Sequence, residues 1–311
     1  MSRLATFLTA IASGIVAAGL YLAVVFGTPG AMILAYLAQF PLFVVGLWLG
    51  TTAAIMAGAS GTVVLLAASD IVGATVYASL TAVPVAILVR QALLAKRRAD
   101  GVFAWYPPGL LAGWLTGIGL VGLGVSLAVF GGPDGLQVAI RNIIGPALDR
   151  IAETPIANRD QIIDTLALIV PGMVTASCML MTVVNGTLGQ GVVARFGLNW
   201  RPSPALSTLS LPWWIPAALG IAAAATMIGG DVRYVGLNAM IALFVPFCLA
   251  GLAVVHALAR RLPHPALALV GFYSLAALFG WPFLAVAILG LLERGLGLRR
   301  RLAPHGVSID G

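Results

Sequence analysis

Long apolar runs separated by short polar segments dominate the chain. Each run is close to the roughly 20 residues that a helix needs to cross a hydrocarbon core about 30 Å thick. Continuous apolar runs favour helices over the strands of a spanning barrel, in which apolar and polar residues alternate. The predicted spanning helices are 5–26, 31–49, 51–69, 71–94, 106–130, 163–190, 211–229 and 235–259.

The last apolar stretch, 265–292, allows more than one interpretation. It is one long helix, a re-entrant pair, or a hairpin broken at Gly280-Trp281-Pro282. Two crossings keep Arg294 and the Arg299–Arg301 run on the side that carries the other basic residues, as the positive-inside rule requires. We therefore expect a hairpin, which gives about ten membrane segments.

Composition agrees with this pattern. Hydrophobic residues make up 60% of the 311 residues and charged residues 9%, and the mean hydropathy is +1.04. About 25% of the residues are charged in an ordinary soluble domain. The expected fold is all-α: a polytopic integral membrane helical bundle forming one domain over 1–311. Helices 1–5 occupy 1–131, an external amphipathic segment occupies 132–162, and the remaining helices and a tail occupy 163–311.

Basic residues sort to one side of the predicted bundle. With the N-terminus in the cytoplasm, the cytoplasmic segments hold nine basic residues before the last stretch: Arg3, Arg90, Lys96, Arg97, Arg98, Arg195, Arg201, Arg260 and Arg261. This predicts a bacterial cytoplasmic (inner) membrane protein with both ends in the cytoplasm. The same rule explains the isoelectric point of 10.1, so the lipid bilayer is an expected partner and nucleic acid is not.

The polar segment 132–162 concentrates charge. Its stretch "DRIAETPIANRD", 149–160, has five charged residues in twelve positions. Before it, the apolar residues between Val138 and Ile151 follow a helical spacing that Pro146 interrupts. We expect an external cap close to Asp70 and Asp231, held by exposed ion pairs of Arg141, Arg150 and Arg159. A mobile lid over a ligand site and a static plug both remain open.

Candidate binding residues are the few polar groups inside the apolar runs and the charged groups at their outer ends. Polar residues at membrane depth usually face the bundle interior, where they bind a ligand or form hydrogen bonds between helices. The candidate substrate-binding residues are Gln39, Asp70, Arg141, Asp160, Asp164 and Asn238.

Small residues recur at intervals of four in the first helix, at Ala10, Gly14 and Ala18. Such a ridge permits close approach of another helix. It is either an internal packing surface or a docking face for a separate membrane subunit.

Catalytic motifs do not emerge from the sequence. It has no HExxH, GxSxG or Walker A motif, and His264 and His305 are isolated. We expect no enzyme activity, no cofactor and no metal site.

The layout resembles a known family. The features are the length, the stretch "PLFVVGLWLGTTAAIMAGASGTVVLL" in the N-terminal part, the polar insertion at 132–162, "LSLPWW" before the predicted helix 211–229, and the C-terminal hairpin. They resemble the YybS-like predicted membrane proteins, a domain family of unknown function that is grouped with the substrate-binding (S) components of energy-coupling-factor transporters.

This resemblance implies a small-molecule-binding transport subunit that docks on a separate membrane subunit with ATPases, partly through small residues of helix 1. Ala10, Gly14 and Ala18 resemble that feature. The alternatives are a non-transport membrane scaffold or envelope assembly factor, and a lipid-handling enzyme.

Overall fold

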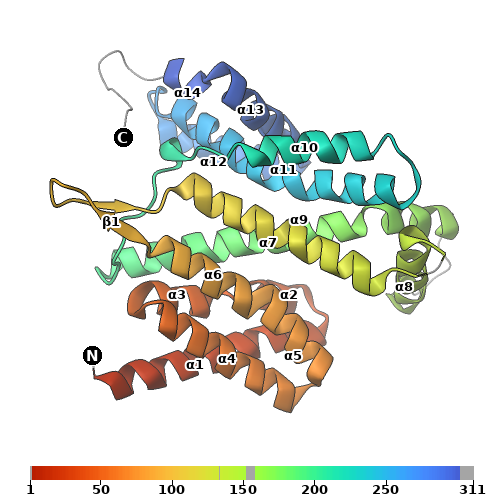
Figure 1. Cartoon of the computed structure of the whole chain (residues 1–311), viewed down its shortest axis with the longest axis horizontal. Helices are drawn as coiled ribbons and strands as arrows, with labels where there is room; N and C mark the ends of the chain where they lie inside the picture. Colours follow the sequence, from red (N-terminus) through yellow and green to blue (C-terminus); the bar gives the residue numbers. More distant parts are fainter. Residues whose placement is uncertain (1, 133, 152–157, 302–311) are drawn as a thin grey trace. The chain divides into compact units, whose positions relative to one another are not determined.

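The computed structural model describes residues 2–132, 134–151 and 158–301. They form helices joined by short connections, with one small β-hairpin (Figure 1). The helical elements are α1 Arg3–Leu22, η1 Ala23–Phe26, α2 Pro29–Tyr36, α3 Phe40–Leu49, α4 Thr51–Ala68, α5 Ile71–Tyr77, η2 Ala78–Ala82, α6 Val83–Ala92, α7 Pro108–Phe130, α8 Leu136–Ile151, α9 Arg159–Arg195, η3 Leu206–Thr208, α10 Trp214–Ala225, α11 Gly230–Ala259, α12 Pro265–Phe279, α13 Pro282–Leu296 and α14 Leu298–Arg301. The strands are β1 Ala95–Arg97 and β2 Phe103–Trp105.

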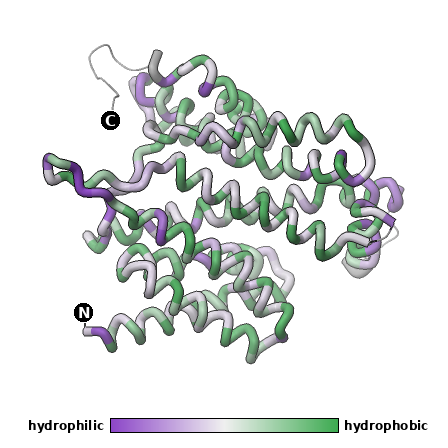
Figure 2. The backbone as a smooth tube through the Cα atoms, viewed as in Figure 1, coloured by the Kyte–Doolittle hydropathy of each residue, from purple (hydrophilic) through white to green (hydrophobic). Residues whose placement is uncertain are grey.

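The expected polytopic helical bundle is confirmed. Within the described ranges, seven helical segments are long and apolar enough to cross a membrane, or eight if the bent pair α12–α13 counts as one span. Figure 2 shows hydrophobic residues along the helices and hydrophilic ones gathered at the hairpin and around α8. Large apolar side chains such as Val25 and Met227, 78% and 88% exposed, fit a lipid environment rather than water.

The structure differs in two places from the predicted count of about ten membrane segments. The expected crossing 211–229 contains the 12-residue helix α10, which is only about 18 Å long at the rise of an α-helix. The helix axis bends by 117° between α12 and α13, with Gly280 at φ +71° between them. The break at Gly280-Trp281-Pro282 is therefore confirmed and one continuous helix is wrong, whereas a single broken span, a hairpin and a re-entrant pair all fit this bend.

Two compact units make up the chain, which is a finer division than the single domain expected from the sequence. Unit 1 comprises Met1–Leu115 and Cys178–Pro204, and unit 2 comprises Thr116–Ser177 and Ala205–Gly311. Two of the three boundaries fall inside helices, within α7 and within α9, and the third, between Pro204 and Ala205, falls in the connection before η3.

Small residues hold the helices of unit 1 close together. Gly14 on α1 lies so near α4 that a Cβ atom would overlap Ser60 Oγ and the Ala57 carbonyl. Ser60 Oγ also donates to the Ile11 carbonyl at 3.3 Å. Close backbone approach, rather than large interlocking side chains, therefore joins these two helices.

The long helix α11 forms the centre of unit 2, where it packs against α10 and α13. Gly251 on α11 faces Val286 and Gly290 on α13 faces Phe247, and a Cβ atom on either glycine would overlap the opposite backbone carbonyl. α13 ends at Gly297 in the left-handed conformation, which suits glycine at a helix C-terminus.

Candidate functional site

The second spanning segment of unit 1 is broken between α2 and α3. Pro41 has no N–H to bond to the Leu37 carbonyl. The Phe40 N–H donates to Leu37 O at 3.0 Å, one residue closer than in an α-helix. The Tyr36 carbonyl therefore loses its usual partner, and Asn185 Nδ2 of α9 donates to it at 2.7 Å.

A second irregularity faces this break. The segment η2, Ala78–Ala82, is a π-helical turn between α5 and α6. Two residues after it comes Pro84, which cannot donate to the Leu80 carbonyl four residues earlier. Gln39 Nε2 donates to that carbonyl at 2.8 Å. The side chain of Gln39 thus joins the two irregular segments, and π-turns are frequent at functional sites.

Glycines bring α9 close to the broken segment. A Cβ atom at Gly189 would lie 2.9 Å from Phe43 Cβ, and one at Gly186 would lie 3.3 Å from the Phe43 ring. The small residues therefore make room for Phe43 and place the neighbouring Asn185 against the end of α2.

Three buried polar atoms of unit 1 have no hydrogen-bond partner within the described part of the protein: Gln39 Oε1 and Asn185 Oδ1 at the broken segment, and Tyr77 OH, which lies against Gly61 of α4. Gln39 and Tyr77 are 0% exposed and Asn185 is 1% exposed. The nitrogen of each amide donates to backbone carbonyls, Gln39 Nε2 to Leu80 and Asn185 Nδ2 to Tyr36 and Met181, so it is the amide oxygens that lack a partner. Each buried group without a partner costs about 1–3 kcal/mol. We define Gln39, Tyr77 and Asn185 as the unit 1 polar site.

Asn238, the other candidate inside the membrane, is fully bonded within unit 2. Its Oδ1 accepts from Gly172 N at 2.7 Å, and its Nδ2 donates to Leu168 O at 3.1 Å and Tyr234 O at 2.9 Å. This supports the interpretation of Asn238 as a helix-to-helix contact. Gln39 belongs to unit 1, and each residue is held by contacts within its own unit.

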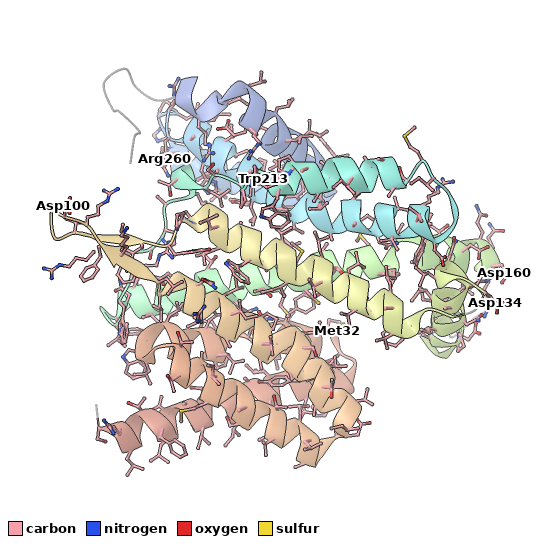
Figure 3. All side chains as sticks on the ribbon, viewed as in Figure 1. Met32, Asp100, Asp134, Asp160, Trp213 and Arg260 are labelled. Atoms are coloured by element: carbon pink, nitrogen blue, oxygen red, sulfur yellow. The ribbon has the colours of Figure 1, made fainter. Side chains whose placement is uncertain are left out.

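The charged candidates of unit 2 lie around α8. Arg141 pairs with Asp164 at 2.9 Å and with Asp160 at 3.5 Å, and Arg159 pairs with Asp149 at 2.6 Å. The hydrogen bond from Arg159 lowers the pKa of the Asp149 carboxyl. Figure 3 shows Asp134 and Asp160 at the α8 end of unit 2 and Arg260 at the opposite end.

The expected helix in 132–162 is confirmed, although residues 133 and 152–157 lie outside the described part. α8 continues through Pro146. Its first turn is anchored by Asp231, whose Oδ1 accepts from Leu136 N at 3.0 Å. Leu136 and Ile140 pack against a core of Leu123, Leu127 and Tyr234. The predicted contact with Asp231 is therefore present, and the roles of lid and static cap both stay predictions.

Asp70, placed in unit 1, caps the start of α5. Its Oδ1 accepts from Gly73 N at 2.7 Å, as expected for aspartate before a helix. This contact gives the side chain a local structural role, and ligand binding by Asp70 stays a prediction.

The ridge of Ala10, Gly14 and Ala18 requires a correction. All three residues are buried, and Gly14 lies against Ala57 and Ser60 of α4. The ridge is an internal packing surface, because α4 already occupies it. It is not a docking face for a separate subunit.

Sequence reasoning missed Asn185 and Tyr77 as members of a site. Asn185 looked like any polar residue in a spanning helix, and Tyr77 like an aromatic residue in an apolar run. The useful signal was the pair of prolines, since neither Pro41 nor Pro84 can donate to the carbonyl four residues earlier, and the helix is irregular beside both. In the ranges that the structure describes, no group of three or more His, Cys, Asp or Glu is arranged to hold a metal ion.

Comparison with known proteins yields one family. The family model described as "Predicted membrane protein (DUF2232)" matches residues 10–293. No curated protein and no solved structure matches the chain.

Proposed function

Because the chain belongs to this family of predicted membrane proteins, we propose that it is a transport-related protein that binds a small molecule at the unit 1 polar site. One observation carries the proposal. Two buried amide oxygens, on Gln39 and Asn185, lack donors beside a broken membrane-spanning helix. Binding sites of many membrane transporters are formed by such interrupted helices.

The unpaired acceptor oxygens at the site define the kind of ligand that it would bind. Amide oxygens accept hydrogen bonds, so the ligand must bring donors such as ammonium, amide N–H or hydroxyl groups. A ligand donor that reaches a buried oxygen removes the cost of about 1–3 kcal/mol that the unpaired oxygen carries. The Tyr77 hydroxyl is both a donor and an acceptor, so it can receive a polar group of the same ligand.

A transport cycle driven by ATP would require partner subunits, because the sequence contains no Walker A motif. Such a partner would contact a surface other than the small-residue ridge of α1, which α4 covers. We place the protein in the bacterial cytoplasmic membrane with both ends in the cytoplasm, on the basis of the positive-inside rule. The proposal includes no catalytic step.

Native mass spectrometry of the protein purified in mild detergent tests this function. We expect a small molecule with hydrogen-bond donors on the wild-type protein and its loss from Gln39→Met, which removes the amide oxygen. Gln39→Glu should retain it, because a protonated carboxyl keeps an acceptor oxygen and can still donate to Leu80 O.

The matched control is Gln137→Met, which removes an exposed amide on α8 and should leave the bound molecule in place. Elution volume and thermal stability of each variant establish that it is folded. An empty wild-type protein, or the same molecule on Gln39→Met, would contradict the proposal and favour the scaffold alternative.

A further inference from the structure

The β-hairpin of unit 1 projects from the ends of α6 and α7, with Asp100 at its tip (Figures 1 and 3). Its turn is closed by a hydrogen bond from Arg98 N to Val102 O at 2.8 Å. Gly101 takes the positive φ of +84° that the turn needs. Asp100 Oδ1 accepts from Val102 N at 2.9 Å, so the one acidic side chain of the hairpin stabilises its own turn.

The strand register places one cation, Arg97, on the same face as two aromatic rings. Arg97 pairs with Phe103 and Ala95 pairs with Trp105. Residues directly opposite each other, and residues two apart, share one face of a hairpin. Arg97, Phe103 and Trp105 therefore lie on one face, where Phe103 is 57% exposed and the two ring centroids are 6.2 Å apart.

A buried arginine fixes the base of the hairpin. Arg201 is 5% exposed, and its guanidinium donates to Ala92 O at 3.1 Å and to Tyr106 O at 2.7 Å. These carbonyls flank the two strands. The Arg201 backbone carbonyl accepts from Gln190 Nε2 at 3.0 Å, which connects this base to α9. Burial lowers the pKa of the guanidinium, so the hairpin is held on the body of unit 1 by a partly desolvated cation.

Aromatic side chains surround this base. Trp114 Nε1 on α7 donates to the Tyr106 hydroxyl at 3.0 Å, and Trp200 is 59% exposed and near Gly50. Trp and Tyr gather at the level of lipid headgroups in membrane proteins. The base of the hairpin therefore has the composition of a membrane–water interface.

The same end of unit 1 is strongly basic. Lys96, Arg97 and Arg98 are exposed on the hairpin, and Arg90 and Arg195 lie in the last turns of α6 and α9. In the part of the chain that the structure describes, these five cations take part in none of the salt bridges. Their charge is available to an anionic partner.

We propose that this basic hairpin surface, Lys96–Arg98 with Phe103 and Trp105, binds the headgroups of anionic phospholipids. Lipid is favoured over an acidic protein for two reasons. The aromatic rings share one face with Arg97, between the neighbouring cations Lys96 and Arg98, and the hairpin emerges from two membrane-spanning helices. Each Lys or Arg near an anionic membrane strengthens binding by about fivefold. This inference does not depend on the unit 1 polar site.

Lipid titration by native mass spectrometry tests the proposal, with the full-length protein and either phosphatidylglycerol or phosphatidylcholine. We expect wild-type protein to prefer phosphatidylglycerol and the variant K96Q/R97Q/R98Q to bind it at least tenfold more weakly. The matched control R3Q/R233Q/R260Q removes three exposed cations elsewhere and should change the affinity less than twofold. Binding of phosphatidylcholine should be the same in all three proteins.

A second measurement probes the hairpin while its three positive charges stay in place. A polarity-sensitive fluorophore on Ala99→Cys, in a background lacking Cys178 and Cys248, is compared in vesicles of phosphatidylcholine alone and of phosphatidylcholine with phosphatidylglycerol at 7:3. We expect a blue shift in the mixed vesicles that high salt reverses. Equal emission in both vesicles overturns the proposal, as does the lack of a phosphatidylglycerol preference or an equal loss in the control variant. Any of these results would leave an acidic protein as the partner to consider.

Discussion

Asn238 on α11 replaces a backbone hydrogen bond that is lost beside Pro171 in α9. The Asn238 amide lies between Gly172 N and Leu168 O, at 2.7 Å and 3.1 Å, two groups that would bond to each other in a regular α-helix. One turn earlier on α11, the Tyr234 hydroxyl donates at 2.6 Å to Ala167 O. Pro171, four residues after Ala167, has no N–H to donate to this carbonyl. Tyr234 and Asn238 together stabilise the proline-containing segment of α9, as the membrane interior requires.

Replacing Asn238 should therefore destabilise the protein more than expected from the small volume of the asparagine side chain. Asn238→Leu leaves Gly172 N and Leu168 O unpaired, and we expect the free energy of unfolding to fall by about 1–3 kcal/mol. Unfolding in detergent mixed with increasing SDS measures this change. The control Gln137→Leu, at an exposed position, should stay within about 0.5 kcal/mol of wild type. Equal effects of the two substitutions would refute the role of Asn238.

The role of Tyr234 can be isolated with a double-mutant cycle. Tyr234→Phe removes the donor to Ala167 O and should cost about 0.5–1.5 kcal/mol. In a Pro171→Ala background, the new backbone N–H can donate to the same carbonyl, so the cost of Tyr234→Phe should shrink. An undiminished cost in that background would show that Tyr234 stabilises the protein by another route.

The sequence predicts the helices of this protein but few of the contacts between them. Apolar runs located the helices to within a few residues, and Gly280-Trp281-Pro282 marked the break between α12 and α13, because run length and helix-breaking residues are local properties. The contact of Asn238 with Gly172 joins residues 66 positions apart. Helix neighbours are set by tertiary packing, so neither this contact nor that of Asn185 with Tyr36 could be predicted from one chain. The β-hairpin was missed because Lys96–Arg98 showed only a run of charge.

The contact between α8 and α9 should weaken in acid. Arg159 holds the pKa of Asp149 below its ordinary value of 3.8. A carboxyl with a lowered pKa stabilises the folded state above its unfolded pKa, and this contribution is lost as the pH falls through the folded pKa. The rate of hydrogen–deuterium exchange of the α8 backbone amides, divided by the intrinsic rate at each pH, should be unchanged from pH 7 to pH 5. It should rise below about pH 4.

Arg141 also joins α8 to α9 through Asp160 and Asp164, so the effect must be assigned to Asp149 by substitution. In the Asp149→Asn variant the α8 amides should exchange faster than in wild type already at pH 5. In the Asp134→Asn variant, changed at an exposed position, they should exchange as in wild type. Identical exchange in the two variants would remove Asp149 from the explanation.

The orientation of the chain can be measured with single cysteines. In a background of Cys178→Ala and Cys248→Ala, an impermeant thiol reagent applied to intact cells should label Gln137→Cys on α8. It should label Ala99→Cys on the basic hairpin only after the cells are permeabilised, because basic segments stay in the cytoplasm. Labelling at Ala99 but not at Gln137 would reverse the proposed topology.

The central claim is that the unit 1 polar site holds a ligand, and an experimental structure of the wild-type protein purified without exhaustive washing tests it most directly. We predict density for a small molecule with a donor about 3 Å from Gln39 Oε1 or Asn185 Oδ1. Density that also reaches the Tyr77 hydroxyl would show that all three residues of the site contact the molecule. Protein donors or single waters at both amide oxygens, with no further density, would contradict the account.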